Sequence, residues 1–105
     1  MIRLLELQGR LFDWDPEKNT ININKHGISF KEAATVFSDE HAVEFDDEAH
    51  SQEEERFIII GRSKRLRVMV VCHCYRVSKS KGSIIRIISA RKAAKHEEQM
   101  YGGDD

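Results

Sequence analysis

The apolar residues alternate most clearly in the second half of the chain, and this pattern predicts β-strands there. The segments RFIIIGR (56–62), LRVMVVCHCYR (66–76) and SIIRIISA (83–90) are rich in β-branched residues, and polar turns near SKR and VSKSKG separate them. Such runs between turn signals are typical of consecutive antiparallel strands. We therefore expect residues 41–90 to form strands, the last three of them joined by hairpins.

A short strand holding Phe12 and Trp14 is predicted to lead into a first helix. Asp15 and Pro16 mark the helix start, because an Asp side chain accepts hydrogen bonds from first-turn amides and Pro suits the first helical position. Gly27 can adopt the left-handed conformation that ends a helix. The first helix is therefore expected to run from Pro16 to the NKHG motif.

A second helix over residues 30–37 is indicated by Ser29 and Glu32, which are spaced as a capping box. In that motif each side chain bonds the backbone amide of the other residue. The segment ARKAAKHEEQMY (90–101) consists of good helix formers and predicts a final helix. Its residues expected to face the sheet are Ala90, Ala93, Ala94 and Tyr101.

Alternation divides the middle strand into two faces. The face expected to form the core carries Leu66, Val68, Val70, Cys72 and Cys74, and the opposite, mixed face carries Arg67, Met69, Val71, His73 and Tyr75.

In the last strand, Arg86 shares a face with Ile84 and Ile88. An unpaired charge within an apolar surface is costly. Arg86 is therefore expected to be paired, to reach water, or to line a groove.

The length and composition fit a single domain. The chain has 105 residues, of which 40% are hydrophobic and 33% charged, enough for a modest core. The N-terminal run MIRLLELQGRLF is too short and too interrupted for a signal peptide or a membrane span. We expect a cytoplasmic protein without membrane contact.

Cys72 and Cys74 flank His73, but C-x-C lacks the spacing of zinc sites and the chain has no second cysteine pair. The sequence therefore predicts two reduced core cysteines and neither a metal nor another cofactor.

The charges are segregated along the chain, although the net charge is only −1. The acidic segment, residues 39–55, holds nine acids and no Lys or Arg, whereas the basic segment, residues 56–96, holds twelve Lys and Arg and no acid. The two segments could neutralise each other, but exposed ion pairs contribute little. A basic, strand-rich segment favours a phosphate-binding surface, and so an RNA or acidic protein partner.

Four ordered motifs resemble one known family. FDWDPEKN, NKHGISFKEA with VFSD, EERFIIIGRS, and IRIISARKA followed by Glu and Tyr are similar to the BrnT toxins, small bacterial proteins that resemble RelE-like ribonuclease toxins. The resemblance spans residues 12–101. The chain departs from it at Lys64-Arg65, where members often place a glycine before the arginine, and in its first eleven residues, which precede the usual start.

The resemblance implies an α+β, RelE-like domain with an antiparallel sheet in the order β-α-α-β-β-β-α. This single domain would span residues 1–105, with 1–11 as a leader and 102–105 as a frayed tail. The implied activity is an endoribonuclease that arrests translation by metal-independent cleavage of RNA, free or on the ribosome. The implied partner is a cognate ribbon-helix-helix antitoxin, through which alone the complex would contact operator DNA.

Metal-free RNA cleavage needs a base, an acid and fixed positive charge at the phosphate. Arg86 and Arg91, carried over from the family's IRIISAR, are the first candidates for holding the phosphate, and Arg62 or Arg65 would reinforce them. As alternatives, Arg86 would pair with an acid of the acidic segment, and Arg91 would be a surface residue at a helix start.

Lys25 and His26 match the family's polar pair, and His26 could exchange a proton because imidazole titrates near neutral pH. The alternative for His26 is a capping group at the helix end. Arg67, His73 and Tyr75 are candidates for RNA contact from their position on the mixed face. The alternative is that such residues simply pack.

Two other classes of function are alternatives. A catalytically degenerate toxin-like module would bind antitoxin and RNA without cutting. A transcription factor that reads DNA directly is disfavoured, because no recognition-helix motif is present.

Overall fold

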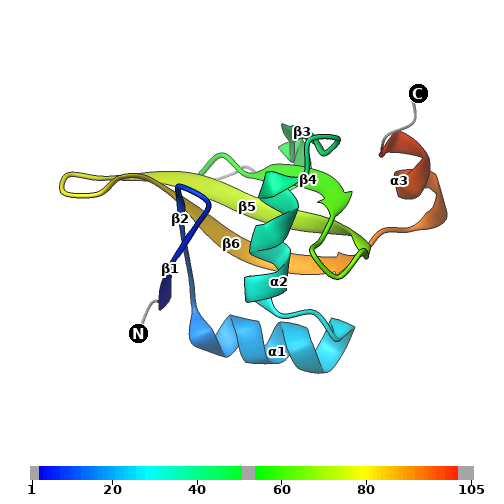
Figure 1. Ribbon diagram of the computed structural model, residues 1–105, viewed down its shortest axis with the longest axis horizontal. Helices are drawn as coiled ribbons and strands as arrows, with labels where there is room; N and C mark the ends of the chain where they lie inside the picture. The colour runs from blue at the N-terminus through cyan, green and yellow to red at the C-terminus, as the bar shows by residue number, and fades with distance from the viewer. Residues whose placement is uncertain (1–2, 51–53, 102–105) are drawn as a thin grey trace.

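The computed structural model describes residues 3–50 and 54–101 of the chain, and within them it shows one six-stranded sheet and three α-helices (Figure 1). The strands are β1 (Arg3–Leu7), β2 (Arg10–Trp14), β3 (Val43–Asp46), β4 (Phe57–Arg62), β5 (Val68–Ser78) and β6 (Gly82–Lys92). The helices are α1 (Pro16–His26), α2 (Phe30–Ala34) and α3 (Lys95–Met100), with short 3-10 helices η1 (Thr35–Ser38) and η2 (Glu48–His50).

The strands lie in the order β1-β2-β6-β5-β4-β3. The hairpin-connected strands β4, β5 and β6 are antiparallel, as predicted. The expectation of a wholly antiparallel sheet is wrong, because β2 pairs with β6 in parallel. Two helices and three strands separate β2 from β6 along the chain, and a long crossover of this kind allows parallel pairing. The strand β1 is an addition to the expected order, and β3 lies within residues 41–90, which were predicted to form strands, but makes a fourth strand there where the order had three.

Residues 3–11 were expected to lie in a leader ahead of the domain, but in the structure they form β1, a tight turn and the start of β2. Gln8 and Gly9 both have positive φ, at 51° and 82°, and Leu7 pairs with Arg10 across the turn. Leu5 and Leu7 pack against the main core. The predicted frayed tail, 102–105, lies outside the described residues, as do 1–2 and 51–53.

The first helix has the predicted ends. The Asp15 side chain accepts a hydrogen bond of 2.9 Å from the backbone N–H of Glu17. Gly27 has φ of 70°, and its N–H donates to the carbonyl of Ile23 at 2.8 Å. The second predicted helix is also present, although η1 continues α2 in a tighter coil through residues 35–38.

Half of the predicted capping box is wrong. Ser29 Oγ does accept from the backbone N–H of Glu32, at 3.1 Å. The Glu32 carboxylate instead binds Arg67 and Ser63 of the β4–β5 hairpin. A two-point contact between a guanidinium and a carboxylate is stronger than a single bond from a neutral amide, so the arginine takes the carboxylate.

The final helix begins later than the propensities indicate. The strand β6 continues to Lys92, because Arg91 and Lys92 pair with Val70 and Met69 of the long strand β5, and this ladder overrides helix propensity. Ala93 is buried as predicted, whereas Ala94 is exposed.

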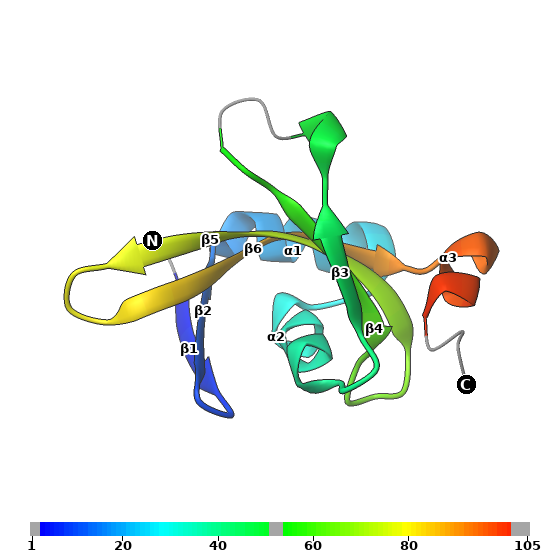
Figure 2. The ribbon, with the colours of Figure 1, turned by 90° about the horizontal axis from the view of Figure 1, so that it is seen from above.

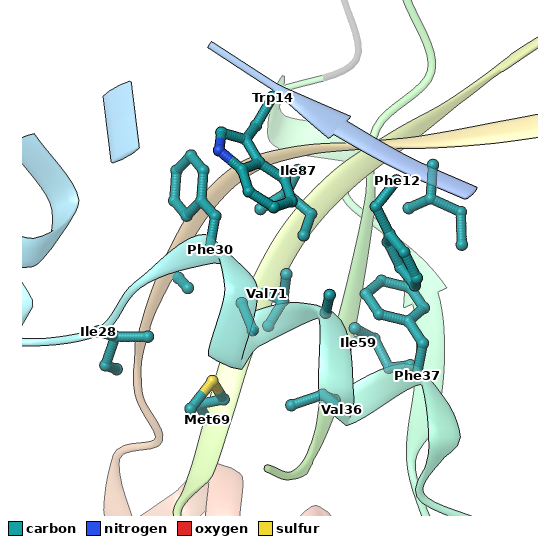
Figure 3. Close-up of a cluster of buried hydrophobic side chains, with 14 residues drawn as sticks. Phe12, Trp14, Ile28, Phe30, Val36, Phe37, Ile59, Met69, Val71 and Ile87 are labelled. Atoms are coloured by element: carbon teal, nitrogen blue, oxygen red, sulfur yellow. The ribbon is translucent and has the colours of Figure 1, made fainter. Parts of the chain in front are cut away.

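The main core lies on the face of the sheet that was predicted to be mixed. Met69 and Val71 are fully buried there, where the core includes Phe30 of α2 and Phe37 of η1 (Figure 3). The opposite face holds a smaller cluster around Ile60, Val70 and Ala93. Alternation alone could not say which face the helices would cover.

The two cysteines lie on this second face and are free, as predicted. Cys74 is buried and Cys72 is half-buried. At Cys72 the ladder with β6 shifts its register, since Cys72 pairs with Ser89 but His73 pairs with Ile87. The shift is a β-bulge, which reverses the alternation of β6 beyond that point.

Asn22 of α1 completes the edge of β6 where β2 no longer pairs with it. Its side chain accepts from the N–H of Ala90 at 3.1 Å and donates to the carbonyl of Ala90 at 2.8 Å. It also donates to the carbonyl of Ile28 at 2.9 Å. This buried amide therefore fixes α1 to the sheet and to the segment that follows the helix.

The β5–β6 hairpin projects from the domain at the end away from α3, as both ribbon views show (Figures 1 and 2). Among the residues described, no helix is long and apolar enough to cross a bilayer.

Candidate nucleic-acid interface

Six of the predicted site residues belong to elements that meet at one end of the sheet, namely the end of α1, the β4–β5 hairpin and the end of β6 (Figure 1). Arg67 lies on the helix face of the sheet, whereas Arg62 and Arg91 pair with Val68 and Val70 and lie on the opposite face. Two contacts bring their elements together: Arg67 Nη2 donates to the carbonyl of Gly27 at 3.1 Å, and the N–H of Ala93 donates to the carbonyl of Val68 at 3.1 Å. We call this surface the basic end, and its residues are Lys25, His26, Arg62, Arg65, Arg67 and Arg91.

A buried carboxylate orders the middle of the basic end. Arg67 Nε donates to Glu32 Oε2 at 2.9 Å and Arg67 Nη2 donates to Glu32 Oε1, while Ser63 Oγ donates to Oε2 at 2.6 Å. The hydrogen bonds from Arg67 lower the pKa of Glu32 against the opposing effect of burial. Glu32 is therefore ionised at neutral pH and holds the guanidinium of Arg67 in one orientation.

Arg67 keeps one donor group for a ligand. Its side chain is 37% exposed, and Nη1 makes no hydrogen bond to the described part of the chain. Arg65 lies beside it, with Nη1 4.0 Å from Glu32 Oε1 and 74% of its side chain exposed. Two guanidinium groups thus flank one carboxylate. Arg65, Arg67 and Glu32 together therefore carry a net positive charge.

Lys25 and His26 are exposed in the last turn of α1. Cations are favoured at a helix C-terminus, which agrees with the capping alternative. However, the capping hydrogen bond comes from the backbone of Gly27, and neither side chain bonds any described residue. Both side chains are therefore available to a ligand.

Arg91 lies at the end of β6, so the alternative that placed it at a helix start is wrong. Its Nη1 and Nη2 donate to the two carboxylate oxygens of Glu97 at 2.8 and 2.7 Å. The N–H of Ala94 donates to the same carboxylate at 2.7 Å. The hydrogen bonds from Arg91 lower the pKa of Glu97 to about 2. The pair thus ties α3 to the sheet, while 45% of the Arg91 side chain stays exposed.

Arg62 begins the same hairpin as Arg65. Its guanidinium carbon lies 5.7 Å from the centre of the Tyr101 ring, and its backbone N–H donates to Asp39 Oδ2 at 2.8 Å. This cation–π contact joins the end of β4 to the residue that follows α3, and Arg62 is exposed.

Arg86 lies in the middle of β6 and not at the basic end. Its Nε and Nη2 donate to the two oxygens of Asp13 at 2.9 and 3.1 Å, and Arg76 Nη1 lies 3.4 Å from Asp13 Oδ2. The alternative of an ion pair therefore describes the contact that the structure shows. The expected partner was wrong, because Asp13 belongs to β2 and not to the acidic segment.

His73 and Tyr75 lie in a third place, further along β5. His73 is completely buried, with Nε2 2.7 Å from Glu44 Oε2 and its ring edge-on to that of Phe37. Its packing agrees with the alternative for that residue. The Tyr75 hydroxyl donates to the same oxygen of Glu44, and burial together with this hydrogen bond raises the pKa of Tyr75.

Several contributing residues were not identified from the sequence as functional. Glu32 had been interpreted as a cap, and Asp13 and Glu44 carried no local signal because their partners lie 73 and 29 residues away. Asp13 and Glu44 share one feature in the sequence, since each acid is next to an aromatic residue, in FDW and VEF.

A small α+β domain with an ordered, exposed basic surface is the kind of protein that binds a polyanion. Residues 14–97 match the family described as the ribonuclease toxin BrnT of type II toxin-antitoxin systems, and the chain belongs to this family.

A solved structure supports the same assignment. The chain resembles the ribonuclease toxin BrnT of Brucella abortus with a TM-score of 0.54 and 26% sequence identity, over 78% of this chain and 94% of that one. No curated protein matches the chain.

Proposed function

We propose that this chain is the toxin of a type II pair and arrests translation as a metal-independent endoribonuclease with a RelE-like domain. Membership of a ribonuclease toxin family supports the reaction class. The observation that carries the proposal for this chain is at the basic end, where Arg65 and Arg67 flank the buried Glu32 and Arg67 also bonds the carbonyl of Gly27, next to Lys25 and His26. RNA is a polyanion, and such a surface would neutralise several of its phosphates.

The residues of the basic end suit the chemistry of RNA cleavage. The ribose 2′-hydroxyl attacks the adjacent phosphorus, the P–O5′ bond breaks, and a 2′,3′-cyclic phosphate and a 5′-hydroxyl are formed. Lys25, Arg65 and Arg67 would hold the crowded phosphate, and Arg91 would hold a neighbouring one. His26 would accept the proton of the 2′-hydroxyl and return it to the leaving 5′-oxygen, since its ring is exposed and makes no bond to the described residues.

The proposed partner is a ribbon-helix-helix antitoxin. An antitoxin with acidic side chains could cover the basic end and so exclude RNA from it. In this arrangement operator DNA would be contacted by the antitoxin and not by the toxin. Whether RNA is cut free or on the ribosome would be decided by comparing naked RNA with translating ribosomes as substrates.

Lys25→Ala and His26→Ala test the proposal, because neither side chain supports the fold through a described bond. Growth arrest and cleavage of RNA by the purified toxin in a chelating buffer would be measured for each variant. We expect losses of about a hundredfold in cleavage rate for each, the range known for single charge-stabilising or proton-transferring groups. Lys18→Ala, on the same helix near its other end, is the matched control.

The same assays separate the degenerate module from the enzyme. A wild-type chain that binds its antitoxin but neither arrests growth nor cuts RNA would be a binding module. Cleavage that requires an added divalent ion would contradict the metal-independent mechanism.

A further inference from the structure

A polar cavity lies between the β1–β2 hairpin, η1 and the strands β3, β4, β5 and β6, and its Asp39 also accepts a hydrogen bond from the backbone N–H of Arg62 at the basic end. We call it the hairpin pocket, and its volume is about 660 Å3. Its apolar residues include Phe37, Ile59 and Ile85, and its polar residues include Arg10, Glu44, Tyr75 and Lys81. The pocket therefore combines an apolar surface with charged groups of both signs.

A fixed carboxylate belongs to this lining. Glu44 uses one oxygen, Oε2, to accept hydrogen bonds from both His73 and Tyr75. Its other oxygen, Oε1, makes no hydrogen bond within the described residues, and 35% of the side chain is exposed. The buried His73 thus fixes Oε2 of Glu44, and Oε1 remains available to accept a hydrogen bond from a ligand.

Two cations come from different parts of the chain. Arg10 comes from the start of β2, where Nη1 donates to the carbonyl of Phe37. Its positive charge partly opposes the rise in the pKa of Tyr75 that burial and the hydrogen bond to Glu44 cause. Lys81 comes from the β5–β6 hairpin, and its ammonium group makes no bond to the described residues. Because Arg10 and Lys81 come from separate elements that line one pocket, an anion bound in the pocket could contact both side chains.

These observations suit a nucleotide better than a simple anion. A nucleotide has a phosphate that needs cations, a flat base that packs on apolar and aromatic groups, and ribose hydroxyls that need an acceptor. A site for phosphate alone would have no use for the free oxygen of Glu44, which would repel it. A solely apolar ligand would leave Arg10 and Lys81 without a role.

We propose that the hairpin pocket binds one unstacked nucleotide of the RNA substrate. Arg10 and Lys81 hold its phosphate, the base packs against Tyr75 and Ile85, and Glu44 Oε1 accepts a hydrogen bond from the ribose 2′-hydroxyl. This inference rests on the proposed function, since it gives the RNA a second point of attachment. Arg10 lies before the residues that match the family, 14–97, so this wall of the pocket is outside the family match.

Binding of ribonucleoside 5′-monophosphates to the whole chain tests the pocket without interference from cleavage. Titration calorimetry would compare the wild type with Arg10→Ala and Lys81→Ala, and we expect each change to weaken binding about tenfold, the loss of one charge-assisted hydrogen bond. Lys79→Ala is the matched control, because Lys79 lies on the same hairpin but does not line the pocket. The corresponding 2′-deoxynucleotides are expected to bind more weakly than the ribonucleotides.

Cleavage kinetics distinguish this inference from the proposed function. The Arg10→Ala, Lys81→Ala double variant should raise KM for RNA while leaving kcat nearly unchanged, because the reacting phosphate lies at the basic end. Unchanged nucleotide binding and unchanged KM in that variant would overturn the pocket but leave the ribonuclease intact. A double variant that loses only antitoxin affinity would identify the pocket as a protein site and also overturn the inference. Nucleotide binding by a wild type that never cuts RNA would instead overturn the proposed function.

Discussion

Arg86 and Asp13 form a two-point ion pair across the parallel ladder that joins β6 to β2. Asp13 is nearly buried, with 7% of its side chain exposed, while Arg86 is 28% exposed. The pair lies at the junction of the N-terminal strands with the rest of the sheet. It explains why an arginine stands among isoleucines in SIIRIISA.

Arg86→Ala is expected to destabilise the domain more than it affects chemistry. Removing the guanidinium leaves a nearly buried carboxylate with only Arg76 beside it, which should cost about 3 kcal/mol of unfolding free energy. Denaturant unfolding of the variant would measure this loss, and Arg76→Ala, which removes a 49% exposed side chain, should cost much less. A fully stable Arg86→Ala protein with cleavage about a hundredfold slower would instead support the phosphate-binding role for Arg86.

Asn22→Ala should be one of the more damaging single changes in α1. It leaves the N–H and carbonyl of Ala90 and the carbonyl of Ile28 without their partner, and unsatisfied buried groups of this kind should together cost about 3 kcal/mol. Asn24→Ala, an exposed site on the same helix, is the control and should change stability little. Equal melting temperatures for the two variants would show that Asn22 does not anchor the helix.

Stability at low pH should depend on Glu97. Its pKa is lowered from 4.5 to about 2 in the folded chain, so its contribution is complete above about pH 4.5 and disappears as the pH falls toward 2. Glu97→Gln should lower the unfolding free energy at pH 7, on the order of 1 kcal/mol because Arg91 is partly solvated. The unfolding free energy of the variant should also fall less steeply than that of the wild type between pH 4.5 and 2.

Glu98→Gln is the matched control for that series, since Glu98 is the exposed neighbour of Glu97 on α3. Denaturant unfolding curves at several pH values would give the pH dependence of the unfolding free energy for both variants. If Glu97→Gln and the wild type lose stability in parallel, the Arg91–Glu97 pair does not contribute in solution.

RNA binding at the basic end should weaken steeply with salt. Each phosphate contact releases counterions, so affinity should fall at least about tenfold between low and physiological ionic strength. Fluorescence anisotropy would measure the slope of log affinity against log salt concentration. The probe would be a 2′-O-methyl RNA, which cannot be cleaved through its own 2′-hydroxyl. Lys25→Ala should reduce that slope by about one, and a flat salt response in the wild type would contradict a phosphate-binding surface.

The local elements of this protein follow from its sequence. Asp15, Pro16 and Gly27 bound α1 because caps depend on residues within one helical turn, and the β-branched runs form β4, β5 and β6 because strand preference is equally local. The free cysteines and the family resemblance also came from short motifs. Local signals failed where a long-range partner competed, as at Glu32 and at the start of α3, and also at residues 3–11, where a predicted leader forms β1 and the start of β2.

The tertiary structure alone decided which residues meet. Alternation separated the two faces of β5 correctly but could not show that the helices cover the face of Met69 and His73. The bond between Arg86 and Asp13 joins residues 73 positions apart, and the assignment of residues 1–11 to a leader concealed β1 and the Arg10 wall of the hairpin pocket. Ion-pair partners and pockets depend on the order and register of strands in the sheet, and that order results from the packing of the whole chain.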